Sequence, residues 1–229
     1  MDAFFIFAVT RGSGEKAVLQ DALSPLHAPQ DMDRYSKIDP DSIGFDIDCV
    51  VADTMEAFIR LALDDYGIAI QPEDITIYEV EKCLAVDPRI IGEIFSRLLD
   101  APVENGLQPM ADAVEVLTAL SGLAPLTFIT ARPVREPIDR WLAQVLPGPV
   151  YNSTRLVAMG NHDGKAAYIK KLGLHYFIDD RLATCVELAG AGFSPIVFEQ
   201  PWNRGQHAFA SVNSWRGIKK RIICHEFDS

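Results

Sequence analysis

Short apolar runs, rich in β-branched and aromatic residues, recur along the chain. Runs of this length without polar alternation are typical of strands that are buried on both faces of a sheet. We expect buried strands in the first part of residues 43–53 and at residues 126–130, 176–178 and 195–198. Residues 150–152 and 156–158 are further strand-like pieces.

Between these runs, apolar side chains recur with the spacing of amphipathic helices. The pattern predicts helices at residues 54–66, 88–99, 111–120, 134–145, 164–173, 181–188 and 211–222. Asp53 or Thr54 can cap the start of the first helix, and Gly67 can cap its end. Strands that alternate with helices imply right-handed crossovers. The predicted fold class is therefore α/β, with a mainly parallel sheet and helices on both faces.

Two parts of the chain stand outside this alternation. Residues 68–106 look helical and contain no strong β run, so we expect a small helical insertion at about residues 56–106, after the first strand. Residues 1–40 are predicted to be an N-terminal extension that is poorly ordered, with a candidate strand at 4–9 and a candidate helix at 13–23. Residues 41–229 then form the core that carries the insertion.

Composition excludes several classes of function. The 229 residues carry a net charge of −11, which opposes binding to nucleic acid polymers and to anionic membranes. No stretch is long enough to span a bilayer, and residues 4–9 lack the basic start and cleavage pattern of a signal peptide. The four cysteines form no C-x-x-C pair, and we interpret them as small buried hydrophobes in a reducing compartment. We therefore expect a cytoplasmic protein.

Carboxylates and a hydroxyl stand where the predicted strands end. Asp46 and Asp48 are two residues apart, so at strand spacing both point to the same side. A buried strand does not tolerate two unpaired carboxylates, which places them at its end. Thr130 ends the second strand, and Asp179 and Asp180 end the third. Because the carboxyl ends of parallel strands meet at one edge, we expect these side chains to converge there.

Four carboxylates that meet at one edge repel each other, so either some of them are protonated or a cation neutralises them. Like charges about 4 Å apart repel by on the order of 4 kcal/mol even when partly screened. No thiolate or imidazole stands at ligand spacing, and oxygen ligands with open water positions suit Mg2+. We infer that Asp46, Asp180 and the backbone carbonyl of Asp48 hold Mg2+. Asp179 is then a further ligand or the holder of a metal-bound water.

The same residues can transfer a phosphoryl group. Beside a cation, Asp46 can attack phosphorus as a nucleophile. Asp48 can protonate the leaving oxygen and then activate a water molecule. Thr130 offers its hydroxyl and backbone N–H to a phosphate oxygen, and Lys165 offers its ammonium group from the start of a predicted helix.

Four segments resemble, in order, the four motifs of the haloacid dehalogenase-like hydrolase superfamily. They are residues 46–51, residues 128–133, Lys165 and residues 178–181. The resemblance covers about residues 41–222. It implies a Rossmann-like core, with the insertion at residues 56–106 as a helical cap; we call this segment the cap. It also implies Asp46 as nucleophile, Asp48 as general acid and base, Thr130 and Lys165 as phosphate ligands, and Asp179 and Asp180 as parts of the metal site.

One branch of the superfamily is most similar to this chain. Dehalogenases of the superfamily lack an acid at the position of Asp48, so the chain resembles its phosphatases. Residues 178–181, together with residues 198–204, resemble the 5′(3′)-deoxyribonucleotidase branch and its uncharacterised bacterial relatives. Where that family most often has glycine and threonine, this chain has Cys49 and Val50.

Some side chains near these motifs admit two roles. Arg132 is either a substrate contact or the structural partner of an acid. Trp202, Asn203 and Arg204 either line the pocket or stabilise their own loop, and of the two we favour the structural role.

The sequence thus predicts a Mg2+-dependent phosphomonoester hydrolase that forms an aspartyl-phosphate intermediate. Its substrate is expected to be a small soluble phosphate ester, with a nucleoside monophosphate as the first choice. Two alternatives are a phosphosugar or other small-metabolite phosphatase or phosphotransferase, and a phosphate-binding domain of the same fold without catalytic activity.

Overall fold

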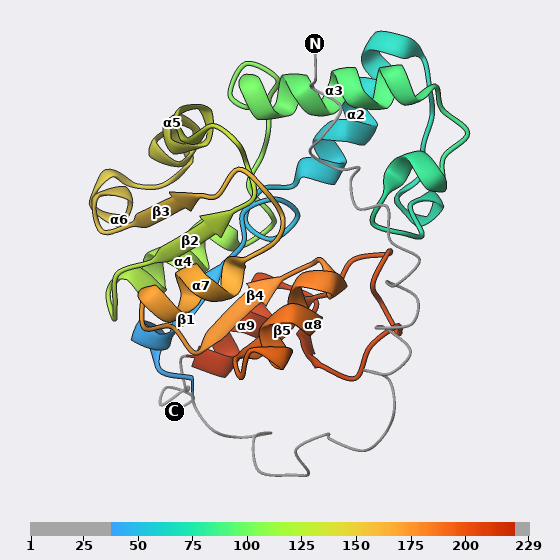
Figure 1. The fold of residues 1–229 in the computed structure, drawn as a ribbon. Helices are drawn as coiled ribbons and strands as arrows, with labels where there is room; N and C mark the ends of the chain where they lie inside the picture. Colours follow the sequence, from blue (N-terminus) through green and yellow to red (C-terminus); the bar gives the residue numbers. More distant parts are fainter. Residues whose placement is uncertain (1–37, 223–229) are drawn as a thin grey trace, which may run out of the picture.

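Residues 38–222 form a six-stranded parallel sheet with helices on both faces (Figure 1). The computed structural model describes residues 38–222. The strands run in the order β3-β2-β1-β4-β5-β6, and every pairing between them is parallel. They are β1 (Ile43–Phe45), β2 (Thr127–Thr130), β3 (Arg155–Ala158), β4 (Tyr176–Asp179), β5 (Ser194–Phe198) and β6 (Ala210–Val212). This confirms the predicted α/β class.

Neighbouring residues in the central strands face opposite sides of the sheet, which gives the protein two apolar layers. Phe128 and Ile178 belong to the larger core, which also contains Trp215. Ile129 and Phe177 belong to a smaller cluster on the other face. The smaller cluster is covered by α7 (Lys165–Lys171) and α8 (Leu182–Gly190), and α4 (Ala113–Ser121) and α9 (Trp215–Ile222) lie behind the sheet (Figure 1).

The cap lies above the carboxyl ends of the strands (Figure 1). Its two main helices are α2 (Thr54–Tyr66) and α3 (Pro88–Asp100), which pack through the stacked rings of Phe58 and Phe95 at a centroid distance of 4.8 Å. The expectation that all of residues 68–106 are helical is wrong for the segment before α3. That segment holds only the 3-10 turns η3 (Pro72–Asp74) and η4 (Val80–Lys82), because Pro72 and a run of polar residues interrupt the apolar spacing.

Two further elements differ from the sequence prediction. Residues 150–152, expected as a strand, belong to the short helix α6 (Gly148–Asn152), which follows α5 (Arg135–Val145) and starts with prolines at 147 and 149. Residues 211 and 212, expected in the last helix, form part of β6. Pairing of Phe198 with Val212 extends the sheet there, and α9 begins only at Trp215. Tertiary pairing outweighs a local helical pattern at this edge.

Several sequence expectations concern residues outside the described range. The N-terminal extension, with its candidate strand and helix, is outside that range apart from residues 38–40, and so is Cys224. The division of the chain at residues 40 and 41 stays a prediction. Cys49, Cys83 and Cys185 are free thiols. No helix between residues 38 and 222 combines the length and the apolar character that a membrane crossing requires.

A compact turn after β1 sets the direction of the candidate catalytic acids. Asp46 extends the strand by one residue, because its N–H donates to Ile178 O of β4 at 2.9 Å. The chain then turns around Ile47, whose carbonyl accepts the N–H groups of residues 50, 51 and 52. Cys49 adopts a left-handed conformation in this turn, with φ of 57°. The turn therefore requires a backbone conformation that glycine adopts more readily than cysteine.

Trp215, the first residue of α9, supports this turn from within the larger core. Its indole Nε1 donates to Val50 O at 2.8 Å, and its ring packs against Phe45 at a centroid distance of 5.4 Å. Trp215 is fully buried, so the contact with the turn is shielded from water. The C-terminal helix thus supports the loop that carries the candidate site.

We expect Trp215→Phe to lower the free energy of unfolding by about 2–4 kcal/mol, because it leaves a cavity and a buried carbonyl without a donor. Urea unfolding followed by circular dichroism measures the change. Arg216→Gln is the matched control, since Arg216 is an exposed neighbour whose ion pair with Asp112 is worth little. Equal unfolding midpoints for the two variants would contradict the supporting role of Trp215.

Candidate active site

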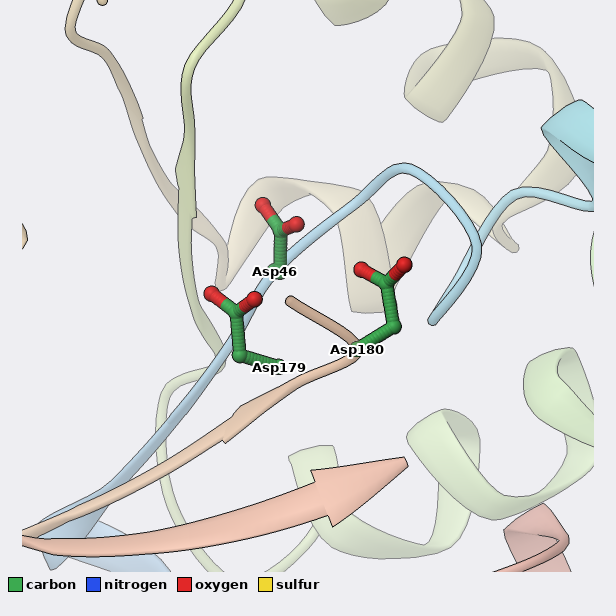
Figure 2. A group of neighbouring side chains, drawn as sticks. All are labelled: Asp46, Asp179 and Asp180. Atoms are coloured by element: carbon green, nitrogen blue, oxygen red, sulfur yellow. The ribbon is translucent and has the colours of Figure 1, made fainter. Parts of the chain in front are cut away.

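Three buried carboxylates lie together where β1 and β4 end. Asp46 comes from the residue after β1, and Asp179 and Asp180 come from the end of β4, the strand beside it. One oxygen of each lies within 4.8 Å of the others, and all three side chains are buried (Figure 2). β1 is the strand at which the sheet order reverses, where α/β proteins usually form their ligand crevice.

Lys165 is the cation that lies among these acids. Its Nζ is 2.6 Å from Asp179 Oδ2 and 2.9 Å from Asp46 Oδ1, and its side chain is itself buried. Burial alone would lower the pKa of Lys165, but the charges of Asp179 and Asp46 outweigh it and raise the pKa above its usual range. The lysine is therefore held in its charged form by the two carboxylates it contacts.

One lysine does not neutralise three acids. Burial, aided by the neighbouring carboxylates, raises the pKa of Asp46 from 3.8 to about 7 despite the nearby Lys165. Burial and the charge of Asp179 raise the pKa of Asp180 well above its usual range. In this geometry the ionised forms of Asp46 and Asp180 both carry an energetic cost that a further cation would remove.

Asp48 lies in a different environment from Asp46, two residues away. Arg132 donates to both of its oxygens, from Nη2 to Oδ1 at 2.8 Å and from Nε to Oδ2 at 3.0 Å. Thr54 donates to Oδ1 at 2.7 Å. Burial would raise the pKa of Asp48, but the charge and hydrogen bonds of Arg132, with that of Thr54, lower it instead. Asp48 is thus stabilised as a carboxylate.

The structure shows one of the two roles that the sequence allowed for Arg132. Its guanidinium pairs with the carboxylate of Asp48, and a contact with the substrate stays a prediction. Thr130, the last residue of β2, is buried beside it, and its hydroxyl accepts the N–H of Arg132 at 3.3 Å.

The loop after β5 holds Asp180 in place. Trp202 Nε1 donates to Asp180 Oδ2 at 3.1 Å. The side chain of Asn203 is buried and donates to the backbone carbonyls of Asp180 and Phe198, at 2.8 and 2.9 Å. Gln200 donates to Cys49 O at 2.8 Å, which joins the same loop to the turn after β1. Trp202 and Asn203 therefore orient a candidate metal ligand as well as their own loop.

The three-carboxylate group fits a divalent cation such as Mg2+. All of its donors are carboxylate oxygens, the donor type that Mg2+ prefers. Asp46 Oδ1 is buried and accepts no hydrogen bond. Lys165 Nζ lies 2.9 Å away, close enough for an ion pair but not in a direction that forms a hydrogen bond. An unsatisfied buried oxygen beside two further carboxylates is what a bound cation would complete. The carboxylate of Asp48 is outside this group, and the contribution of its backbone carbonyl stays a prediction.

The sequence reasoning did not find two residues close to the site. Thr54, considered as a helix cap, donates to Asp48, and Asp53 is the residue that caps α2. Tyr78, in the cap, packs its ring on the guanidinium of Arg181 at 5.5 Å and on the ring of His162 at 6.2 Å. A single tyrosine in a polar segment of the cap has no periodic pattern, so no signal in the sequence indicated this contact.

Comparison with known proteins identifies one protein family that matches most of the chain. The family described as "5′ nucleotidase, deoxy (Pyrimidine), cytosolic type C protein" matches residues 41–226. None of the curated proteins is significantly similar in sequence.

Solved structures share the fold. A haloacid dehalogenase-like hydrolase from Streptococcus pneumoniae has a TM-score of 0.54 at 13% identity, over 78% of this chain and 96% of its own. A putative phosphoglycolate phosphatase from Lactobacillus plantarum has a TM-score of 0.52 at 14% identity, over 80% and 99%. A putative hydrolase of the same superfamily from Bacillus subtilis, bound to magnesium, has a TM-score of 0.51 at 13% identity, over 78% and 96%.

The raised pKa of Asp46 predicts how metal-free stability depends on pH. The folded state binds the proton on the Asp46 carboxyl group more tightly than the unfolded state does. Protonation of Asp46 therefore stabilises the fold fully below about pH 4, and this stabilisation is lost as the pH rises to about 7. We expect the free energy of unfolding of the wild type, relative to Asp46→Asn, to fall across this window in EDTA. Urea unfolding at several pH values measures the difference, and parallel pH curves would refute the prediction.

Proposed function

Because the chain belongs to the 5′ nucleotidase, deoxy (pyrimidine), cytosolic type C family, a family of phosphatases, we propose that it hydrolyses small phosphate monoesters through an aspartyl-phosphate intermediate. We further propose that the reaction depends on Mg2+ and that the substrate is a nucleoside monophosphate. The family match supports the nucleotide, and the acidic site supports the metal.

One observation carries the proposal. Asp46 is held between a buried lysine and two further buried carboxylates, within reach of a shared cation. A purely structural group of this kind would leave buried like charges uncompensated, at a cost to folding. A dianionic phosphate ester requires positive charge around its oxygens, and Lys165 with a bound cation would supply it.

In the proposed first step, an oxygen of Asp46 attacks phosphorus and the bond from phosphorus to the ester oxygen breaks. Asp48 takes up a proton from water before this step, although Arg132 favours its carboxylate form, and gives that proton to the departing oxygen, which leaves as an alcohol. Lys165 and the hydroxyl and N–H of Thr130 hold the phosphoryl oxygens, as the resemblance implies. The products of this step are the alcohol and a phosphoryl group bound to Asp46.

In the second step, water attacks the phosphorus of the phosphorylated Asp46. Asp48, now a carboxylate, accepts a proton from that water, and the bond between phosphorus and the Asp46 oxygen breaks to release inorganic phosphate. Arg132 favours the carboxylate form that this step needs, because it lowers the pKa of Asp48.

Asp46, Asp179 and Asp180 would hold Mg2+, with Trp202 orienting Asp180. The ion, when bound, would neutralise part of the charge on the phosphate and on the acids. Asp46 then keeps one oxygen free to act as the nucleophile.

A phosphate-release screen tests the proposal. Purified protein is incubated with purine and pyrimidine nucleoside monophosphates, in ribose and deoxyribose forms, and with sugar phosphates, each with Mg2+ or with EDTA. We expect turnover with Mg2+ only, highest on a nucleotide. Highest activity on a sugar phosphate would overturn the nucleotide assignment, and no hydrolysis of any ester would favour the binding domain without activity.

Replacing the nucleophile tests the covalent step. We expect Asp46→Asn to lower kcat by about 10³-fold or more, because the amide is a poor nucleophile and we assign no other described side chain to attack phosphorus. Acid quenching during turnover of a ³²P-labelled substrate should leave label on the wild-type protein and none on the variant. Thermal unfolding is the control for folding, since removing a buried charge should not destabilise the metal-free protein. Turnover at the wild-type rate would rule out Asp46 as nucleophile.

A further inference from the structure

Arg132 joins the cap to the site through buried hydrogen bonds. It follows β2 in the core, and only 2% of its surface is exposed. Its Nη2 and Nε hold the two oxygens of Asp48, and its Nη1 donates to Leu98 O at 3.0 Å and to Leu99 O at 3.4 Å. Both carbonyls belong to the last turn of α3, in the cap.

This arrangement uses the geometry of the guanidinium group. Its N–H donors lie in one rigid plane. When Nη1 is held by a carbonyl of α3, the direction in which Nε and Nη2 donate to Asp48 is therefore fixed. The last carbonyls of a helix have no partner within the helix and carry its partial negative charge. The end of α3 is therefore a suitable anchor for a buried cation.

The two oxygens of Asp48 are not equally occupied. Oδ1 accepts from both Arg132 Nη2 and Thr54 Oγ1, and Oδ2 accepts from Arg132 Nε. A carboxylate oxygen has two acceptor positions, and those of Oδ1 are both filled, so a proton is exchanged more readily at Oδ2. The side chain of Asp48 is 21% exposed, so it is within reach of a substrate or water.

We propose that Arg132 is a positioning residue: anchored on the end of α3, it turns Asp48 so that Oδ2 exchanges the proton with the leaving oxygen and with water. The inference rests on the proposed function and extends it, because it assigns the cap a part in proton transfer in addition to any contact with the substrate.

Leaving groups with different needs for a proton separate positioning from folding. A nucleoside 5′-monophosphate releases an alkoxide that must be protonated, whereas p-nitrophenyl phosphate releases an anion that is stable without a proton. The value of kcat/KM reports the steps up to transfer to Asp46. The ratio of kcat/KM for the nucleotide to that for the aryl ester, within one preparation, is independent of how much of a variant is folded.

We expect Arg132→Met and Asp48→Asn each to lower this ratio by on the order of 10²-fold, because a misplaced or missing proton donor penalises only the alkyl ester. The double variant should be no worse than Asp48→Asn alone. Arg132→Lys should also lower the ratio by at least about 10-fold, since an ammonium group keeps the charge and cannot hold both oxygens and the helix end in one plane.

A second variant tests the anchor on the cap. Asn105 fixes the end of α3, because its side chain donates to Arg97 O at 3.1 Å and to Ala101 O at 2.8 Å. Asn105→Ala should lower the same ratio by several-fold although Asn105 lies outside the site. Arg140→Met is the matched control: Arg140 is an exposed arginine that joins α5 to Glu104 near the end of the cap, and its loss should leave the ratio unchanged.

The outcomes are separable. A wild-type ratio in both Arg132 variants would overturn the proposal, and a wild-type ratio in Asn105→Ala would overturn its cap anchor. An unchanged ratio in Asp48→Asn would instead reject Asp48 as the acid, and a wild-type protein inactive on both esters would reject the proposed function itself.

Discussion

The structure depends on the balance of charge among three buried carboxylates and one buried lysine. Carboxylates removed from water at the ends of β1 and β4 are costly to ionise, and Lys165 compensates for only part of that cost. Buried like charges that one lysine does not fully compensate are more typical of functional sites than of packing. The rest of the fold holds these groups in place against their repulsion.

Supports for this group come from segments that are far apart in the sequence. Trp215 of the last helix holds the turn after β1, and Trp202 and Asn203 hold Asp180 from the loop after β5. Lys165 reaches the acids from the start of α7. Each support uses a buried hydrogen bond or ion pair, so movement of any one element would leave a polar group unpaired.

Environment separates two aspartates that are chemically identical. Asp46 is surrounded by acids and by apolar burial, which raises its pKa, whereas Asp48 faces Arg132 and Thr54, which lower its pKa. Different environments of this kind are how enzymes assign different roles to paired carboxylates. The i and i+2 spacing alone could not distinguish them.

Local pattern was sufficient for the fold class, for most strands and helices, and for the candidate acids, because strand burial and helical periodicity are properties of short segments. It failed at residues 150–152, at 211–212 and across the first half of the cap, where edge pairing and prolines overrode propensity. Local pattern could not predict side-chain contacts between segments that are far apart in the sequence. The pairing of Arg132 with Asp48 and α3, and of Trp202 with Asp180, exists only once the strands are side by side. The sequence therefore determined which groups could react, and the tertiary structure decided which charges each one meets, since electrostatic interactions depend on distance and burial in space.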